Sequence, residues 1–152
     1  MDIYTDVVIV GTGVGGLFAA LNIELDKKVM LITKSDLESS DSFLAQGGIC
    51  VERDDDDYES YFEDTMKAGH YENRKESVDI MIRSSREIIE DLVSYGVEFE
   101  KKDGEFVYTR EGAHSKPRIL YHEDITGQEI TSKLLELSLI HISEPTRLDV
   151  IS

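Results

Sequence analysis

The chain has 152 residues, with 32 acidic against 16 basic side chains and a formal net charge of −16. This length suffices for one domain with a hydrophobic core. The negative charge argues against nucleic acid and anionic membranes as partners, because both would repel the protein. The single cysteine, Cys50, cannot form an internal disulfide, which favours a reducing, cytoplasmic setting and a packed structural thiol. We expect neither a secretion signal nor a membrane span, since no apolar run is long enough.

The chain opens with the pattern of a β-α-β unit. Ile3 to Val10 is predicted to form a buried parallel strand, Val14 to Leu25 a helix, and Lys28 to Thr33 a second strand. The helix has one apolar face, made of Leu17, Ala20, Leu21 and Leu25. This order predicts an α/β fold.

The glycine spacing between the first strand and the helix is that of a dinucleotide-binding turn. Gly11 permits a tight turn, Gly13 lets a backbone approach a diphosphate, and Gly16 lets the helix pack close to the strand. The first-turn N–H groups and the helix dipole would then face the diphosphate. The alternative is a glycine-rich turn in another α/β protein. A Walker A loop is excluded, because Leu17 and Phe18 follow the last glycine.

The residue after the second strand departs from the usual nucleotide-binding pattern. An acidic residue normally accepts hydrogen bonds from the ribose hydroxyls at this position, whereas this chain has Lys34. A lysine fits phosphate or adenine-side contacts and fits simple NAD binding poorly. Ser35 to Ser42 then has the composition of a polar surface loop. Beyond it, Gly47 and Gly48 permit close backbone approach directly after the amide of Gln46.

The middle of the chain is acidic and helical. Arg53 to Asp64 is expected to be a solvated loop and helix start. Asp54 to Asp57 lack the spacing and glycine of a calcium loop, so no metal site is expected. Tyr58 to Ala68 and Lys75 to Tyr95 are predicted helices. The second of these stops near Gly96 and has a core-facing stripe made of Val78, Met81, Ile82, Ile88, Ile89 and Leu92.

A hairpin and a cationic stretch follow. Val97 to Glu100 and Glu105 to Thr109 are predicted to pair across the loop Lys101 to Gly104. The segment Arg110 to His122 then gathers side chains suited to carboxylate binding and proton transfer, namely Arg110, Glu111, His114, Lys116, Arg118 and His122. Two interpretations stay open from spacing alone: a ligand-binding segment, and an ordinary polar loop before a strand at Arg118 to Tyr121.

Four segments together are similar to one family of flavoproteins. They are GTGVGG at Gly11 to Gly16, TK at Thr33 and Lys34, SFLAQGGI at Ser42 to Ile49, and TREGAHSKPRILYHEDITGQE at Thr109 to Glu129. Residues 1–136 resemble the amino-terminal part of the L-aspartate oxidases, flavoproteins that start quinolinate and NAD synthesis in bacteria. The resemblance implies an α/β fold, the truncated amino-terminal part of a Rossmann-like FAD-binding domain. It would be a β-α-β dinucleotide fold with inserted helices and a hairpin.

The resemblance also implies a site for FAD. Thr12 to Gly15 would hold the diphosphate and Lys34 the adenosine side, while Asp41 to Gly48 would wrap the diphosphate and approach the isoalloxazine. The implied cofactor-binding residues are Gly11, Thr12, Gly13, Val14, Gly15, Gly16, Lys34, Asp41, Ser42, Phe43, Leu44, Ala45, Gln46, Gly47 and Gly48. In homologous membrane-bound succinate dehydrogenases and fumarate reductases, a histidine five residues before the glutamine of AQGG bonds covalently to the flavin. This chain has Asp41 there, so non-covalent FAD is implied.

The implied reaction is oxidation of L-aspartate to iminoaspartate, with hydride transfer from the α-carbon to flavin N5. Oxygen or fumarate would reoxidise the flavin, and quinolinate synthase would act next. Glu111 matches the glutamate that faces the amino group of the substrate. The family's catalytic Arg and His residues lie further along, so none is assigned in this chain. The alternatives are a flavoprotein subunit of succinate dehydrogenase or fumarate reductase, a related soluble fumarate reductase, and a non-catalytic nucleotide-binding module.

The carboxyl-terminal part begins with a predicted helix over Asp124 to Glu136, with Thr126 as N-cap and Glu129 as its capping-box partner. The family resemblance stops at about Glu136. The string LSLIHISEPTR from Leu137 onward resembles the translation of a sequencing-library adapter. We therefore predict a native part at 1–136 and a non-native tail at 137–152. The 152-residue chain is expected to be poorly stable, with exposed apolar surface liable to associate.

Overall fold

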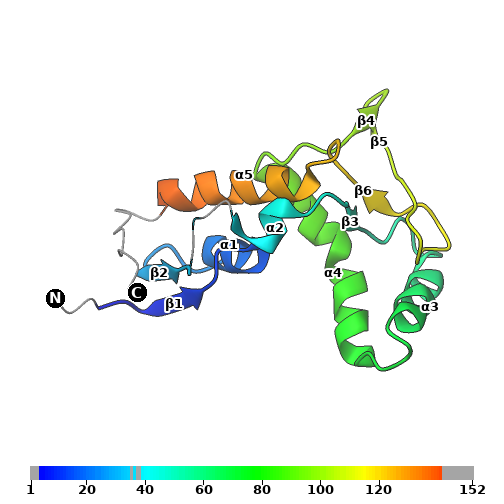
Figure 1. Ribbon diagram of the computed structural model, residues 1–152, viewed down its shortest axis with the longest axis horizontal. Coiled ribbons are helices and arrows are strands. Elements are labelled where there is room, and N and C mark those ends of the chain that lie inside the picture. Colours follow the sequence, from blue (N-terminus) through cyan, green and yellow to red (C-terminus); the bar gives the residue numbers. More distant parts are fainter. Residues whose placement is uncertain (1–3, 35, 37–38, 142–152) are drawn as a thin grey trace. The chain divides into compact units, whose positions relative to one another are not determined.

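A computed structural model describes residues 4–34, 36 and 39–141 of the chain (Figure 1). Its helices and strands form two compact units. The first unit comprises the described residues up to Gln46 and those from Gly127 onward, and the second comprises Gly47–Thr126. Each unit has buried apolar side chains and at least one pair of strands.

The first unit contains the predicted β-α-β arrangement. Strand β1 (Val7–Val10) pairs in parallel with β2 (Val29–Ile32) over their whole length, and helix α1 (Val14–Leu21) connects them. A parallel pair requires a crossover of this kind, since a tight hairpin joins only antiparallel strands. The described part of β1 begins at Val7, later than predicted, and Ile3 lies outside the described residues. The α/β class and the β-α-β order are confirmed.

Helix α1 ends earlier than the sequence predicted. Asn22 closes it, because its side-chain Nδ2 donates to the carbonyl of Phe18 at 2.8 Å and its backbone N–H bonds to the last turn. Leu17 is buried as predicted, but Leu25 lies beyond the helix and is 86% exposed. The apolar face therefore stops at Leu21, and Leu25 is a surface residue.

The glycine turn has the backbone geometry that the motif predicted. Gly11 has a φ of +106°, in the left-handed region that favours glycine. A Cβ added at Gly16 would overlap the carbonyl oxygen of Gly11 and would lie 3.3 Å from Cγ2 of Ile9. The absence of a side chain at Gly16 is what lets α1 pack against the end of β1.

A short helix, α2 (Asp41–Leu44), follows β2 in the first unit. The hydroxyl of Ser40 caps it by accepting a hydrogen bond from the N–H of Phe43 at 3.2 Å. The prediction of a polar loop over Ser35 to Ser42 is therefore wrong at its end. The serine and aspartate that look like turn residues in the sequence are the cap and first residue of a helix.

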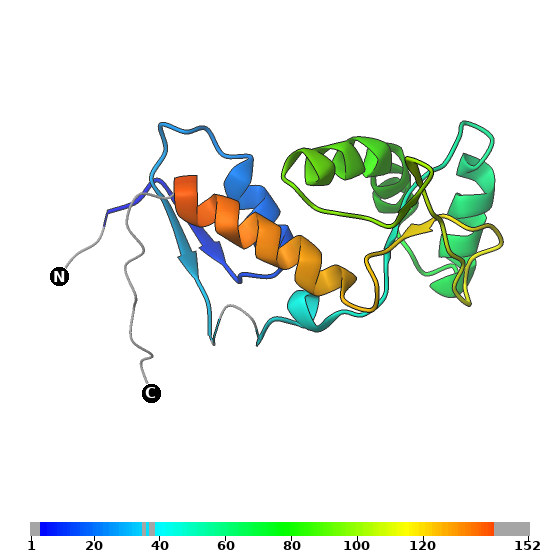
Figure 2. The same ribbon diagram turned by 90° about the horizontal axis from the view of Figure 1, so that it is seen from above.

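Helix α5 (Thr126–His141) runs beside α1 in both views (Figures 1 and 2). Its buried side chains include Ile130 and Leu134. The helix starts against α2, because the N–H of Gly127 donates to the carbonyl of Ala45 at 2.9 Å. A side chain at Gly127 would overlap that carbonyl oxygen.

The two ends of α5 differ from the prediction. Thr126 is its first residue, and the Thr126 hydroxyl accepts from the N–H of His122 at 2.9 Å. The helix also continues beyond Glu136 to His141. Residues 142–152, which include most of the predicted tail, lie outside the described residues.

The second unit is built on two packed helices, α3 (Tyr58–Ala68) and α4 (Lys75–Ser94), as predicted. Their shared core consists of Tyr61, Met66, Val78 and Ile82. Gly96 follows α4 with a φ of +89°, which fits its predicted role as a stop. Met81 is 44% exposed and does not belong to the core stripe, because it lies at the edge of the buried helix face.

Two short antiparallel pairs complete the second unit. Strand β3 (Ile49–Cys50) pairs with β6 (Ile119–Leu120), and β4 (Lys101–Lys102) pairs with β5 (Glu105–Phe106). The hairpin is tighter than predicted, since the two lysines assigned to its loop are paired. Its turn, Asp103–Gly104, has φ values of 53° and 88°, as a two-residue hairpin requires. The β3–β6 pairing was not predicted.

We expect Gly16→Ala to destabilise the protein by about 1–3 kcal/mol, because the added methyl overlaps backbone atoms that cannot move cheaply. Gly15→Ala is the matched control, since nothing lies within 4 Å of a Cβ there. Alanine at Gly15 should stabilise α1 by up to about 1 kcal/mol. Urea unfolding followed by circular dichroism measures both changes. Equal midpoints for the two variants would contradict the close packing of α1 on the turn.

Candidate functional site

A groove in the first unit gathers predicted residues from three separate segments. It encloses about 430 Å³ beside the glycine turn, the end of β2 and the start of α2. The predicted residues that line it are Gly11, Thr12, Gly13, Lys34 and Asp41. Thr12 is buried, whereas the side chains of Lys34 and Asp41 are exposed. The groove therefore combines bare backbone, several hydroxyl side chains, the cation of Lys34 and the carboxylate of Asp41.

The amino-terminal end of α1 opens at this turn. The N–H of Val14 donates to Oγ of Ser42 at 3.1 Å. A Cβ at Gly13 would lie 3.0 Å from the same hydroxyl oxygen. Gly15 and Gly16 follow in the first turn, where backbone N–H groups have no acceptor within the helix. Together with the positive end of the helix dipole, this arrangement suits an anion such as a diphosphate.

The other predicted cofactor residues lie after Ser42. Phe43 is half-buried, and the exposed residues that follow are Leu44, Ala45 and Gln46. Gly47 and Gly48 belong to the second unit. A Cβ at Gly48 would overlap the carbonyl oxygen of Leu120. Close packing on β6 is therefore a structural reason for glycine at this position.

Glu111 lies on a loop of the second unit, residues 110–118, which we call the Glu111 loop. Its base is closed by Thr109 and Ile119, which exchange backbone hydrogen bonds of 2.9 and 3.1 Å. The side chain of Glu111 is exposed. Its two carboxylate oxygens lie 3.7 and 3.9 Å from where a Cβ would stand at Gly47. The loop thus presents a carboxylate to solvent beside a bare stretch of backbone.

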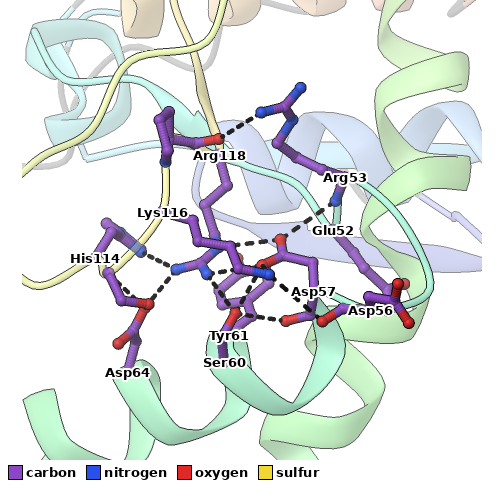
Figure 3. A network of polar contacts seen from close by, with 12 residues as sticks. Glu52, Arg53, Asp56, Asp57, Ser60, Tyr61, Asp64, His114, Lys116 and Arg118 are labelled. Atoms are coloured by element: carbon purple, nitrogen blue, oxygen red, sulfur yellow. Dashed lines mark hydrogen bonds and ion pairs between the residues drawn. The ribbon is translucent and has the colours of Figure 1, made fainter.

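Arg118, at the end of the Glu111 loop, is completely buried and lies at the centre of a polar network (Figure 3). Its Nε and NH2 donate to the two oxygens of Asp57 at 3.2 and 2.8 Å. NH1 donates to Oδ2 of Asp64 at 2.6 Å and contacts Nδ1 of His114 at 3.1 Å. NH2 also donates to Oγ of Ser60 at 3.0 Å. The guanidinium is therefore bound on every side.

The two carboxylates of this network are held in their charged form. Burial alone would raise the pKa of Asp57, but hydrogen bonds from Arg118 and Ser60 outweigh it and hold the pKa far below its ordinary value. Burial likewise opposes ionisation of Asp64. Hydrogen bonds from Ser115 and Arg118 lower the pKa of Asp64 below its ordinary value. The cluster is thus an ion pair already formed at neutral pH.

His114 connects this network to Cys50. A guanidinium can only donate, so the contact with Arg118 makes Nδ1 of His114 an acceptor and leaves the proton on Nε2. Nε2 lies 3.3 Å from Sγ of Cys50. Burial and the nearby Arg118 charge lower the pKa of His114, and burial raises the pKa of the Cys50 thiol. A neutral imidazole therefore faces a neutral thiol, beside a cavity of about 570 Å³.

The family model described as FAD binding domain matches residues 6–145 of the chain. The chain belongs to this FAD-binding family. It is 45% identical over 131 residues to the L-aspartate oxidase of Clostridium perfringens, a match that covers 86% of this chain and 30% of that protein. It is 44% identical over 135 residues to the L-aspartate oxidase of Clostridium acetobutylicum, covering 88% of this chain and 31% of that protein.

Solved structures with this FAD-binding fold match over most of the chain. The quinol fumarate reductase of E. coli matches with a TM-score of 0.85 and 27% identity, covering 93% of this chain and 25% of that one. The Sdh1 complex of Mycobacterium smegmatis matches with a TM-score of 0.78 and 29% identity, covering 86% and 23%. The predicted family resemblance is confirmed. The chain spans about a third or less of the curated relatives named above.

FAD is the cofactor of this family, and the groove of the first unit has features that fit it. The glycine turn leaves the backbone bare where a diphosphate would approach, and Lys34 supplies a positive charge in the same groove. Among the described residues, no group of three or more His, Cys, Asp or Glu side chains is arranged to hold a metal ion. No helix in the described part of the chain is long and apolar enough to cross a membrane.

Sequence reasoning missed the polar network in this FAD-binding chain. Asp57 lies in a run of four aspartates that was predicted to be solvated, yet it is fully buried. Two interpretations were open for the segment that contains Arg118, ligand binding and an ordinary structural role. The contacts of Arg118 favour the structural role. No local pattern marks the pair, because Asp57 and Arg118 are separated by 61 positions in the chain. The one signal in the sequence is that Arg118 directly precedes two apolar residues, Ile119 and Leu120. A cation buried beside them needs a buried counter-charge.

We expect Asp57→Asn to destabilise the protein by about 3–5 kcal/mol at neutral pH, because it leaves a buried guanidinium without its main counter-charge. The stability due to Asp57 is complete above about pH 5 and is lost as the pH falls below the ordinary carboxyl value of about 3.9, since its pKa is lowered in the folded state. Asp54→Asn, at an exposed position, is the control. Denaturant unfolding at pH 7 and at pH 3 measures both. Equal losses of unfolding free energy in the two variants would refute the assignment of Asp57 as the main counter-charge of Arg118.

Proposed function

We propose that the protein containing this chain oxidises L-aspartate to iminoaspartate with FAD as cofactor. The observation that carries this proposal is the exposed carboxylate of Glu111, standing beside Gly47 in a chain that is 45% identical to an L-aspartate oxidase. L-Aspartate carries an ammonium group next to two carboxylates. A carboxylate is the side chain suited to hold that ammonium.

In this proposal the glycine turn, Lys34 and the segment Asp41 to Gly48 bind the cofactor. Gly11 to Gly16 and Asp41 to Gly48 contact the diphosphate and approach the flavin ring, and Lys34 binds on the adenosine side. FAD, when bound, accepts the hydride that leaves the α-carbon of the substrate. The homologous membrane enzymes attach flavin covalently through a histidine at the position of Asp41. An aspartate cannot form that bond, so FAD would be held by non-covalent contacts.

The task of Glu111 is to bind and orient the substrate. Its carboxylate is exposed, so a substrate ammonium can reach it from solvent. A charge-assisted hydrogen bond between this carboxylate and the ammonium would hold the substrate in a defined orientation. The catalytic Arg and His residues of this family lie outside the chain, so we assign no proton transfer to it.

A second candidate is a flavoprotein that interconverts succinate and fumarate. It is favoured by the TM-score of 0.85 with the quinol fumarate reductase of E. coli. Succinate has no nitrogen, so Glu111 has no cation to bind in that reaction and would oppose a dicarboxylate. We therefore rank L-aspartate first.

Further parts of the proposal rest on the resemblance to the L-aspartate oxidases. Oxygen or fumarate would reoxidise the flavin, and quinolinate synthase would consume iminoaspartate in the cytoplasm. We also propose that residues 1–136 are the native part of the domain and that 137–152 are a fused, non-native tail. The tail proposal is supported by the adapter-like string at Leu137 to Arg147. Sequencing the source locus beyond Glu136 tests it, and a native gene with the same last residues would refute it.

We expect Lys34→Gln to weaken FAD binding about tenfold, because it removes the only cation that lines the groove within the described residues. Lys28→Gln is the matched control, with the same charge change at an exposed lysine of the same unit that does not line the groove. Flavin fluorescence quenching at low and moderate salt measures the affinity. The difference between the variants should shrink as salt rises. Equal affinities at low salt would count against this groove as the FAD site.

We expect Glu111→Gln to raise the KM for L-aspartate about tenfold or more in the full-length, FAD-loaded protein, because it removes the charge that pairs with the substrate ammonium. Inhibition by succinate should stay equal or strengthen, since succinate lacks that ammonium. Steady-state kinetics with both compounds provides the measurement. If the parent protein turns over succinate and not L-aspartate, the second candidate replaces the first.

A further inference from the structure

The Glu111 loop has no regular secondary structure, so side-chain contacts must hold its far end in place. Its base is closed by the Thr109–Ile119 pair, and within it the N–H of His114 donates to the carbonyl of Glu111 at 3.0 Å. No helix or named strand is assigned between positions 110 and 118, which are all described. The position of Glu111 therefore depends on what binds the other half of the loop.

A single carboxylate oxygen of Asp64, on α3, binds the half of the loop that contains Ser115. Oδ2 of Asp64 accepts from the backbone N–H and from the hydroxyl of Ser115, each at 2.7 Å. The same atom accepts from NH1 of Arg118 at 2.6 Å. The side chain of Asp64 is only 15% exposed, so these bonds are little weakened by water. Figure 3 shows Asp64 reaching from α3 to this end of the loop.

His114, in the middle of the loop, also contacts the ring of Tyr61 on α3 edge-on, with centroids 6.1 Å apart, and Sγ of Cys50 at 3.3 Å. The remaining contacts are longer or more exposed, and NH1 of Arg53 lies 3.5 Å from the carbonyl of Pro117. Nζ of Lys116 lies 3.4 Å from the carbonyl of Asp56 and 3.6 Å from Oδ1 of Asp57. Its side chain is 46% exposed, and exposed ion pairs of this length contribute little. The Arg118–Asp57 pair fixes the start of β6 and does not touch Ser115. Of the hydrogen bonds that reach the chain between His114 and Arg118, those of Asp64 are the shortest.

We propose that Asp64 is a positioning residue for Glu111. By binding Ser115 and Arg118 through one carboxylate oxygen, it fixes the loop so that the Glu111 carboxylate stands beside Gly47. This inference rests on the proposed function, in which Glu111 binds the substrate ammonium. Asp64 acts through the loop, and its own carboxylate is occupied by protein donors.

Loss of Asp64 therefore has two separable effects. Asp57 still pairs with Arg118 in such a variant, so we expect the loop to loosen more than the helices α3 and α4 around it. Recognition of the ammonium weakens while recognition of the two substrate carboxylates, which does not involve Glu111, stays unchanged. A purely structural role would change the whole unit and would not distinguish L-aspartate from succinate.

The first test is hydrogen exchange by mass spectrometry on the full-length, FAD-loaded protein. Asp64→Asn should speed exchange in peptides covering residues 110–118 about tenfold, the loss expected from a charge-assisted hydrogen bond. Peptides from α4, in the same unit as the loop, should change much less. Glu59→Gln, an exposed carboxylate on the same helix, is the control and should leave the loop as in the parent. Unchanged exchange in Asp64→Asn would overturn the proposal.

The second test uses steady-state kinetics of the same variants. Asp64→Asn should raise the KM for L-aspartate about tenfold, with kcat and the inhibition constant of succinate changed less than about threefold. If Glu111→Gln raises this KM and Asp64→Asn does not, the positioning role is wrong and the proposed function stands. If Glu111→Gln has no effect on the KM, the proposed function fails. Hydrogen exchange then still decides whether Asp64 holds the loop.

Ser115→Ala keeps the proposal testable if Asp64→Asn does not load FAD. It removes one of the three hydrogen bonds to Asp64 at an exposed residue. We expect exchange in the loop and the KM for L-aspartate to rise about threefold, in the same direction as for Asp64→Asn. A Ser115→Ala protein identical to the parent in both measurements would overturn the proposal.

Discussion

The second unit depends on the burial of one charge, the guanidinium of Arg118. Removing such a group from water costs several kcal/mol unless its donors are satisfied and its charge is balanced. Asp57 and Asp64 meet that requirement from the residue that precedes α3 and from its second turn. Because Arg118 directly precedes β6, the same bonds fix where β6 lies against α3. The pairing of β6 with β3 then fixes the chain at Ile49 and Cys50.

The choice of arginine and two carboxylates has a geometric consequence beyond its free energy. An apolar group of the same volume is often as stable in a protein interior as a buried ion pair. A guanidinium, however, donates in fixed directions, so its bidentate bond with Asp57 leaves NH1 aimed at Asp64 and His114. The orientation of the Arg118 guanidinium therefore helps to determine the course of the Glu111 loop. An apolar substitute would fill the space and would leave the loop without a defined course.

The sequence predicted what depends on local patterns and missed what depends on distant contacts. The β-α-β unit and the helices α3 and α4 follow from periodicity and glycine positions, and all are present. The pairing of β3 with β6 was missed because each strand has two residues and its partner lies about seventy positions away. Leu25 matched the helical period, but Asn22 ends the helix before it. Burial of Asp57 within an acidic run is set by Arg118, which no window around the aspartates contains.

The cofactor-site prediction shows the same division. Gly11, Thr12, Gly13, Lys34 and Asp41 line one groove because the strand ends and the turn of a β-α-β unit meet at one edge of its sheet. That placement follows from the motif. Glycine at position 48 was explained in the sequence by approach to a ligand, but the structure gives a packing reason on β6. A glycine in a binding motif can thus be required by the fold itself.

The groove also shows how a protein with a net charge of −16 is able to attract an anion. Charges spread over the surface act across a screened distance of roughly 8–10 Å at physiological salt. The N–H groups of the first turn of α1 act at hydrogen-bond distance, where their orientation outweighs the distant field. Asp41 lines the same groove and opposes the anion, so Lys34 and the backbone must outweigh it locally. If FAD binds in this groove as proposed, the overall charge would govern the association rate of its diphosphate, and the glycine turn would govern the dissociation rate.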